Sequence, residues 1–82
     1  MVDEDLRAQA HDLDVTVWVG KKGIDAVVEE LDGQLSNENL VKIKFLRAAR
    51  SAGSTEELAT ELADSVSATL VETRGNTGVL HR

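Results

Sequence analysis

The sequence contains no cysteine and no proline, and its large aromatic side chains are one tryptophan and one phenylalanine. Without cysteine, the chain cannot form disulfides, thiolate nucleophiles or cysteine-based zinc sites. No apolar stretch approaches the ~20 residues of a membrane-spanning helix. The first residues are acidic, whereas a secretory signal begins with basic residues and an apolar run. We therefore expect a cytoplasmic protein with no membrane partner.

Patterns typical of catalysis and of metal binding are also missing. No nucleophile elbow is present, the carboxylates fall on predicted solvated helix faces, and neither His11 nor His81 has a second ligand at metal spacing. A chain of 82 residues should form one domain, over residues 1–82. Because a domain of this size buries only around two thirds of its unfolded surface, a core and a deep catalytic cavity hardly fit together. The sequence predicts a non-enzymatic domain without a cofactor or metal.

The pattern that is present is that of an α/β domain. Apolar residues recur at helical spacing over residues 3–12, 24–35 and 55–66, and they alternate with polar residues over 13–19 and 41–45. Ser54 and Glu57 have the spacing of a capping box, and Gly75-Asn76 separates two short strands over 69–74 and 77–81. The expected order is α-β-α-β-α-β-β. Helices should cover a mixed sheet in which the last hairpin is the only antiparallel connection.

A glycine-flanked turn, Gly20-Lys21-Lys22-Gly23, lies between the first predicted strand and the second predicted helix. Glycine permits backbone angles closed to other residues and lets a phosphate approach the main chain. We expect the loop to feed directly into the helix, whose first turn has unpaired N–H groups and a partial positive charge. The turn is similar to the GxxG loop of KH domains, which clamps nucleic-acid backbone. The alternative is an ordinary solvated turn, because GxxG alone is a weak signal.

The charge distribution is uneven. The net charge of -6 argues against a polyanion partner, because nucleic-acid binders normally show a basic excess. Between Asn39 and Thr55, however, every charged residue is basic, and these residues are Lys42, Lys44, Arg47 and Arg50. Lys42 and Lys44 share one strand face, so the four residues can form a cationic track. The alternative is a solubilising outer face. Arg74 and Arg82 are further candidates.

Several segments resemble the YhbY/CRM family. They are residues 6–13 running into Val17-Trp18-Val19-Gly20-Lys21-Lys22-Gly23-Ile24, residues 38–45, and the closing Gly78-Val79-Leu80-His81-Arg82. The resemblance implies a two-layer α/β fold with a four-stranded mixed sheet, similar to the C-terminal domain of translation initiation factor three. It also implies RNA binding, associated in bacteria with precursors of the large ribosomal subunit and in plant organelles with intron splicing. His81 replaces the usual tyrosine, and a proline frequent near Val15 is absent.

The sequence therefore predicts a monomer that binds structured RNA and acts in large ribosomal subunit assembly. Its partner would be ribosomal RNA or a pre-ribosomal particle. The predicted contact residues are Gly20, Lys21, Lys22, Gly23, Lys42, Lys44, Arg47, Arg50 and Arg74. The alternative is a protein-interaction module in which the GxxG turn is only structural and an acidic helical surface recruits the partner. An RNA-processing enzyme would need residues that the sequence lacks.

Two single residues have an expected role. Trp18 should pack in the structure, under the first helix, although its place opposite Val17 and Val19 also permits it to stack on a base. His11, at the end of the first helix, should make a polar contact there.

The acidic composition itself suggests a salt-rich cytoplasm. Lysine is scarce, acidic residues number 15, and alanine, valine and threonine are abundant. At molar salt the screening length falls to about 3 Å, so distant carboxylates hardly repel RNA while direct contacts persist.

We predict that the melting temperature rises with potassium chloride, because salt screens the repulsion among the carboxylates. Thermal unfolding followed by circular dichroism at increasing salt measures this effect. A melting temperature that does not rise would contradict adaptation to high salt.

Overall fold

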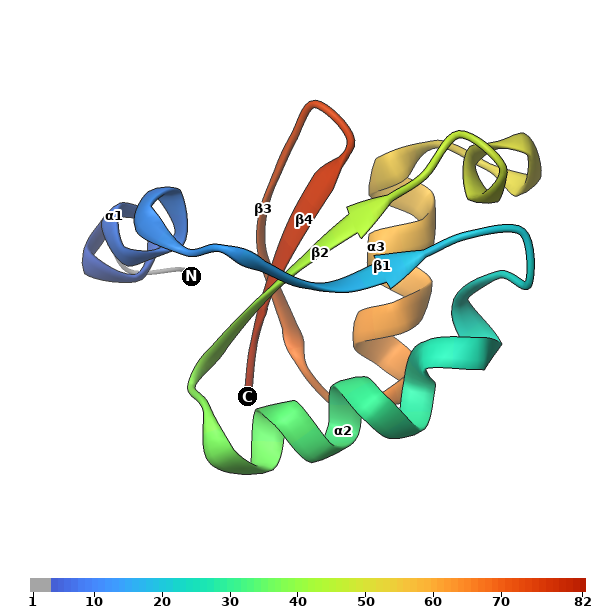
Figure 1. Cartoon of the computed structure of the whole chain (residues 1–82). Coiled ribbons are helices and arrows are strands. Elements are labelled where there is room, and N and C mark those ends of the chain that lie inside the picture. Colours follow the sequence, from blue (N-terminus) through green and yellow to red (C-terminus); the bar gives the residue numbers. More distant parts are fainter. Residues whose placement is uncertain (1–3) are drawn as a thin grey trace.

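The helices and strands follow one another in the order that the hydrophobic periods predict (Figure 1). The computed structural model describes residues 4–82, and their side chains from residue 8 onward. Its elements are α1 (Glu4–Asp12), β1 (Val15–Val19), the 3-10 turn η1 (Ile24–Val27), α2 (Val28–Asn37), β2 (Leu40–Phe45), the 3-10 turn η2 (Ala49–Ala52), α3 (Thr55–Ser65), β3 (Thr69–Arg74) and β4 (Thr77–His81). Asp3, included in the first predicted helix, lies outside the described residues. The predicted fold class is confirmed.

The four strands form one mixed sheet in the order β1-β2-β4-β3. β1 and β2 are parallel, because α2 carries the chain back between them. β4 returns from β3 through a tight turn and is antiparallel to both of its neighbours, β2 and β3. The predicted hairpin is thus present, and its insertion beside β2 adds a second antiparallel pairing that the sequence does not reveal.

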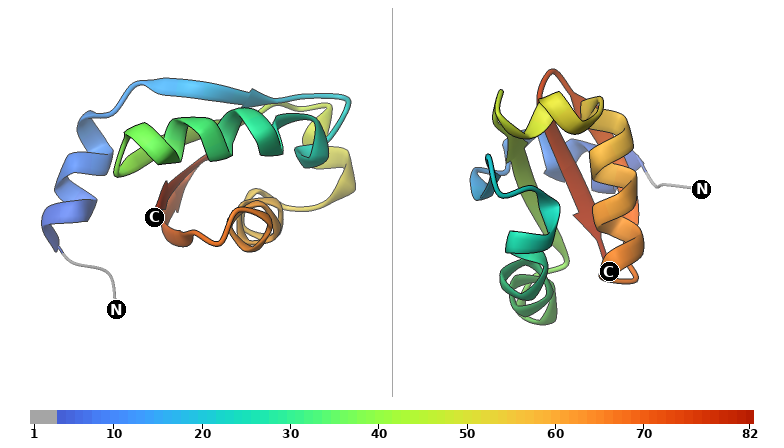
Figure 2. Two further views of the ribbon diagram at one scale, coloured as in Figure 1. Left: turned by 90° about the horizontal axis from the view of Figure 1, so that it is seen from below. Right: turned by 90° about the vertical axis from the view of Figure 1, so that its right-hand side faces the viewer.

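One face of the sheet packs against α2 and α3, and Figures 1 and 2 show these two helices together, with α1 set apart from them. The large side chains that are fully buried in this core are Phe45, Leu31, Ile43, Leu62, Leu80, Val17 and Val19. Burying such a side chain contributes about 1.5–3 kcal/mol. The alternating apolar residues of β1 and β2 therefore face α2 and α3, and the residues between them face the other way.

The start of α3 is fixed by the predicted capping box. Ser54 Oγ accepts a hydrogen bond from the Glu57 backbone N–H at 3.1 Å, and Glu57 Oε1 accepts one from the Ser54 N–H at 3.3 Å. Both N–H groups would otherwise lack a partner at a helix N-terminus. The sequence signal for this helix is confirmed.

α1 packs on the opposite face of the sheet. Ala10, only 1 % exposed, forms a small second core with Leu13, Leu40, Val71 and Val79. His11 Nε2 lies 2.9 Å from Glu72 Oε1 on β3, which confirms the polar contact expected at the end of this helix. We call the face that carries α1 the outer face. α1 covers the outer face near β3 and β4 and does not extend over Trp18 on β1, which is 54 % exposed.

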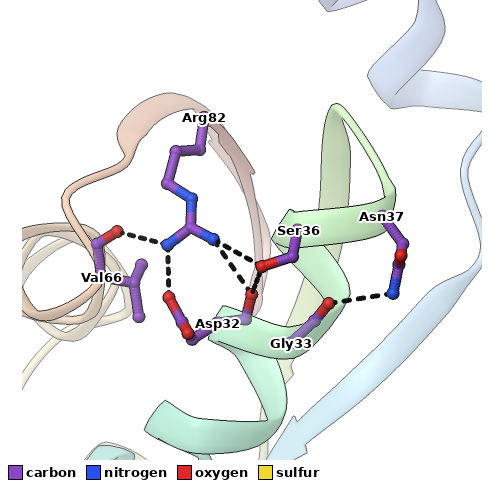
Figure 3. A network of polar contacts seen from close by, with 6 residues as sticks. All are labelled: Asp32, Gly33, Ser36, Asn37, Val66 and Arg82. Carbon is purple, nitrogen blue, oxygen red and sulfur yellow. Dashed lines mark hydrogen bonds and ion pairs between the residues drawn. The ribbon is translucent and has the colours of Figure 1, made fainter.

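Arg82 joins α2 to the C-terminal end of α3 through its guanidinium group (Figure 3). Its Nη1 donates to the Val66 carbonyl oxygen at 3.0 Å and forms an ion pair with the Asp32 carboxylate. Its Nη2 donates to the Asp32 carbonyl oxygen at 3.1 Å and to Ser36 Oγ at 3.2 Å. The Arg82 side chain is 28 % exposed. These bonds hold α2 against the end of α3, so Arg82 has a structural role.

No helix among residues 4–82 is long and apolar enough to span a membrane.

Replacing Arg82 with alanine should lower the free energy of unfolding by about 1–2 kcal/mol. The loss is moderate because Asp32 is 57 % exposed and water screens the ion pair. Arg82→Lys should recover only part of the loss, since one ammonium group cannot make the forked contacts. Urea denaturation measures all three proteins. Arg74→Ala, which removes an exposed arginine, is the control and should change stability by less than about 0.5 kcal/mol.

Candidate functional site

The GxxG segment forms a closed turn at the end of β1. The Gly23 N–H donates to the Gly20 carbonyl oxygen at 3.0 Å. Gly23 has a φ of 81°, a region that side chains with a Cβ rarely adopt. The closure places Lys21 and Lys22 at the two central positions of the turn, where both are exposed. Glycine at the end of the turn is therefore required by the backbone geometry.

The turn does not feed directly into an α-helix, so that part of the prediction is wrong. The 3-10 turn η1 (Ile24–Val27) follows it, and α2 begins at Val28. Val27, with φ -112° and ψ 0°, interrupts helical geometry between them. Short 3-10 turns are common at the start of α-helices, and the hydrophobic spacing of the two forms is too similar to tell apart in sequence. The N-terminus of α2, with its partial positive charge, therefore lies one 3-10 turn beyond the GxxG turn.

The turn nevertheless presents unpaired donors of its own. Among residues 4–82, the backbone N–H groups of Lys21 and Lys22 donate no backbone hydrogen bond. The ion pairs between described side chains are His11 with Glu72 and Arg82 with Asp32, so neither lysine is bound to a carboxylate of residues 8–82. Two ammonium groups and two amides at one exposed turn can all serve as donors to an anion.

A second set of predicted residues lies on the outer face. In the strand register, Trp18 pairs with Lys44, Lys44 with Thr77, and Thr77 with Arg74. These residues form one row across all four strands, with neighbouring strands roughly 5 Å apart. Lys42 lies on the same face, two residues before Lys44, and both lysines are half-buried. The structure brings Lys42, Lys44 and Arg74 together on one surface.

Arg47 and Arg50 are exposed in the segment that follows β2. Because β1 and β2 are parallel, their carboxyl ends lie at the same end of the sheet, where open α/β sheets commonly bind ligands. Figure 1 shows the turn after β1 and the segment with η2 together at this end. The Leu46 N–H donates to the Val19 carbonyl oxygen at 2.8 Å, which fixes the two segments side by side.

Seven of the 15 acidic residues lie in the two helices of the other layer. Neither α2 nor α3 contains a lysine or arginine, although the whole chain has 9. The carboxylates of these two helices are those of Glu29, Glu30, Asp32, Glu56, Glu57, Glu61 and Asp64. On the outer face, the carboxylate of Glu72 is paired with His11. The helices on the core face are therefore purely acidic, whereas the outer face carries Lys42, Lys44 and Arg74 together with α1, which itself contains three acidic residues.

Trp18 does not pack under α1, so the expectation of a structural role there is wrong. Its neighbours Val17 and Val19 are fully buried, but Trp18 itself is 54 % exposed. α1 packs over β3 and β4 because Ala10 meets Val71 and Val79 there. Leu46, which is 39 % exposed, was missed by the sequence analysis. Continuing the alternation from Lys42 and Lys44 would have placed it on the same face.

The described residues contain no cluster of metal ligands, and a cleft that they form lies away from the GxxG turn. No three His, Asp or Glu side chains among them gather as metal ligands would. A cleft of about 440 Å³ is lined partly by Leu13, Asp14, Asn37 and Leu40, which precede β1 and β2 or begin β2. It therefore lies toward the other end of these strands, away from the GxxG turn.

Comparison with known proteins supplies the family. The family model for the CRS1/YhbY (CRM) domain matches residues 3–82. A probable RNA-binding protein of Methanocaldococcus jannaschii is 40% identical over 77 residues, which are 94% of this chain and 58% of that protein. The chain thus spans little more than half the length of this relative.

A solved structure has a similar fold. The solution structure of a hypothetical protein from Staphylococcus aureus, described as a candidate RNA-binding protein, is similar over 100% of this chain and 88% of that one. The TM-score is 0.80 and the sequence identity is 29%. With the family match over nearly all of its residues, the chain is a member of the CRS1/YhbY (CRM) domain family.

Proposed function

We propose that this domain binds structured RNA and that the GxxG turn holds the sugar-phosphate backbone. The observation that carries the proposal is the exposed turn itself, with two lysines outside any described ion pair and two amides without a backbone acceptor. Phosphate oxygens accept hydrogen bonds from such donors and are attracted to the ammonium groups. The names of the archaeal and staphylococcal relatives, which both refer to RNA binding, support the same function.

The outer face and the end of the sheet would extend this contact. Lys42, Lys44 and Arg74 lie on the outer face, and Arg47 and Arg50 lie beside the GxxG turn. RNA that follows this surface meets these cations, while the acids of α2 and α3 lie on the other face of the sheet. Such contacts give affinity through phosphates and depend little on base sequence.

The biological setting follows from the family resemblance. We propose that residues 1–82 act as one domain, as a monomer in the cytoplasm, on ribosomal RNA or a precursor of the large ribosomal subunit. In this proposal the domain has no catalytic step of its own and contributes binding.

A protein-interaction module is the competing function. It is favoured by the acidic surface of α2 and α3, which carries no lysine or arginine and could attract a basic partner. In that case the GxxG turn would only connect β1 to η1. The test of RNA binding decides between the two.

Replacing both Lys21 and Lys22 with alanine should weaken RNA binding by about 10-fold or more at moderate salt, because two phosphate contacts are lost. The slope of log affinity against log salt should also become shallower, by about 1.5 to 2. Filter binding with structured fragments of large-subunit ribosomal RNA over a salt series measures both quantities.

The matched control is the double variant Gln9→Glu/Asn39→Asp. It changes the net charge by the same amount, but both residues are exposed and lie away from the turn, in α1 and before β2. It should leave the salt slope nearly unchanged. An unchanged affinity in Lys21→Ala/Lys22→Ala would refute the turn as the phosphate site, and no RNA binding by the wild type would favour the protein-interaction module.

A further inference from the structure

Two large apolar side chains stand exposed beside each other on the outer face. Among the described side chains, the exposed large hydrophobic residues are Trp18 at 54 % and Leu46 at 39 %. Trp18 pairs with Lys44 in the strand register, and Leu46 follows two residues after Lys44 on the same face. Gly20 lies next to Leu46, because a Cβ built on Gly20 would be 3.7 Å from Leu46 Cδ1. Trp18, Gly20 and Leu46 therefore form a continuous apolar patch.

This patch adjoins the turn that we assign to phosphate. Gly20 is both a member of the patch and the first residue of the GxxG turn, so the indole of Trp18 lies only a few residues from Lys21 and Lys22. On its other side, Trp18 has Lys44 as its strand neighbour. Cations thus lie beside Trp18 on the neighbouring strand and beyond it at the end of β1.

No other part of the described chain covers Trp18. β1 is an edge strand, so only β2 borders it within the sheet. α1, the helix on the outer face, packs on Leu40, Val71 and Val79 instead. Large aromatic side chains contribute much to core stability when buried, and this chain has one tryptophan. The packing of the fold does not explain why Trp18 is exposed.

The chemistry of the patch matches one nucleotide. A nucleobase offers a flat apolar face that stacks on an indole, and the attached phosphate is an anion that Lys44 and the GxxG turn can bind. A purely apolar partner would leave the flanking lysines without acceptors. In an RNA duplex the faces of the bases are already stacked on one another, so only an unpaired base can reach the indole.

We propose that Trp18 is a stacking platform for one unpaired nucleobase, whose adjoining phosphates are held by Lys44 and the GxxG turn. This proposal rests on the proposed RNA-binding function and narrows its substrate to structured RNA with an unpaired nucleotide in a loop, a bulge or an end. Leu46 extends the surface that the base covers. Stacking tolerates any base, so the site selects for an unpaired nucleotide and not for a sequence.

The sequence offers a direct probe of this contact. Trp18 is the sole tryptophan and the chain has no tyrosine, so the intrinsic fluorescence reports on this one side chain. The wild-type protein would be titrated with a short single-stranded adenylate oligonucleotide, with the same strand in a duplex, and with an abasic strand of equal length. The single strand should quench the fluorescence at saturation, and the duplex and abasic strands should quench it much less.

Variants test the energetic contribution by anisotropy of labelled RNA. Trp18→Ala should weaken binding of the single-stranded oligonucleotide by about 10-fold, and Trp18→Phe should recover most of the affinity, since it keeps a ring. Affinity for the abasic strand should be the same in all three proteins. Circular dichroism checks that each variant folds, and the wild-type quenching stands as a test that needs no variant.

The outcomes separate this inference from the function on which it rests. Unchanged single-strand affinity in Trp18→Ala, or equal quenching by the abasic strand, would overturn the stacking site. If Lys21→Ala/Lys22→Ala still weakens binding in that case, the RNA-binding function stands without it. A wild-type protein that binds none of the RNAs would overturn both, and quenching by a protein partner alone would assign the patch to protein docking.

Discussion

The parallel pairing of β1 with β2 is the constraint on which the candidate site depends. It brings the carboxyl ends of the two strands to one end of the sheet, so the GxxG turn and the segment with Arg47 and Arg50 become neighbours. The same register sets Trp18 beside Lys44. The pairing is in turn held by α2 and α3, which bury the alternate residues of both strands. A shift of one residue in the pairing of β1 with β2 would turn Trp18 or Lys44 toward the core, and the row of side chains on the outer face would be lost.

The placement of the charges on the two faces of the sheet also explains how an acidic chain can bind a polyanion. The two helices that cover the core face carry acids without a lysine or arginine, whereas Lys42, Lys44 and Arg74 lie on the outer face. The sheet and the core separate the two sets. An RNA strand over Lys42, Lys44 and Arg74 would thus have the acids of α2 and α3 behind the sheet, and salt would screen these carboxylates and those of α1. Net charge is a poor guide to the partner when the cations gather on one surface.

Much of this fold can be predicted from local sequence. The capping box at Ser54, the turn at Gly75-Asn76 and the alternating strands are short-range signals, each set by residues that are neighbours in the chain. The GxxG turn could be located for the same reason. What sequence did not reveal depends on long-range packing. α1 covers β3 and β4 and leaves Trp18 exposed. The structural role of Arg82 was not predicted, because its partners Asp32 and Val66 are distant from it in sequence.

In the proposed complex, the RNA backbone contacts the amides and lysines of the GxxG turn. The most direct measurement is a titration of the ¹⁵N-labelled protein with structured RNA, in which the backbone amide resonances are followed by NMR. The amides of residues 20–24, with those of Lys44 and of the segment from Leu46 to Arg50, should shift or broaden first. Shifts confined to α2 and α3, with the turn unaffected, would contradict the account.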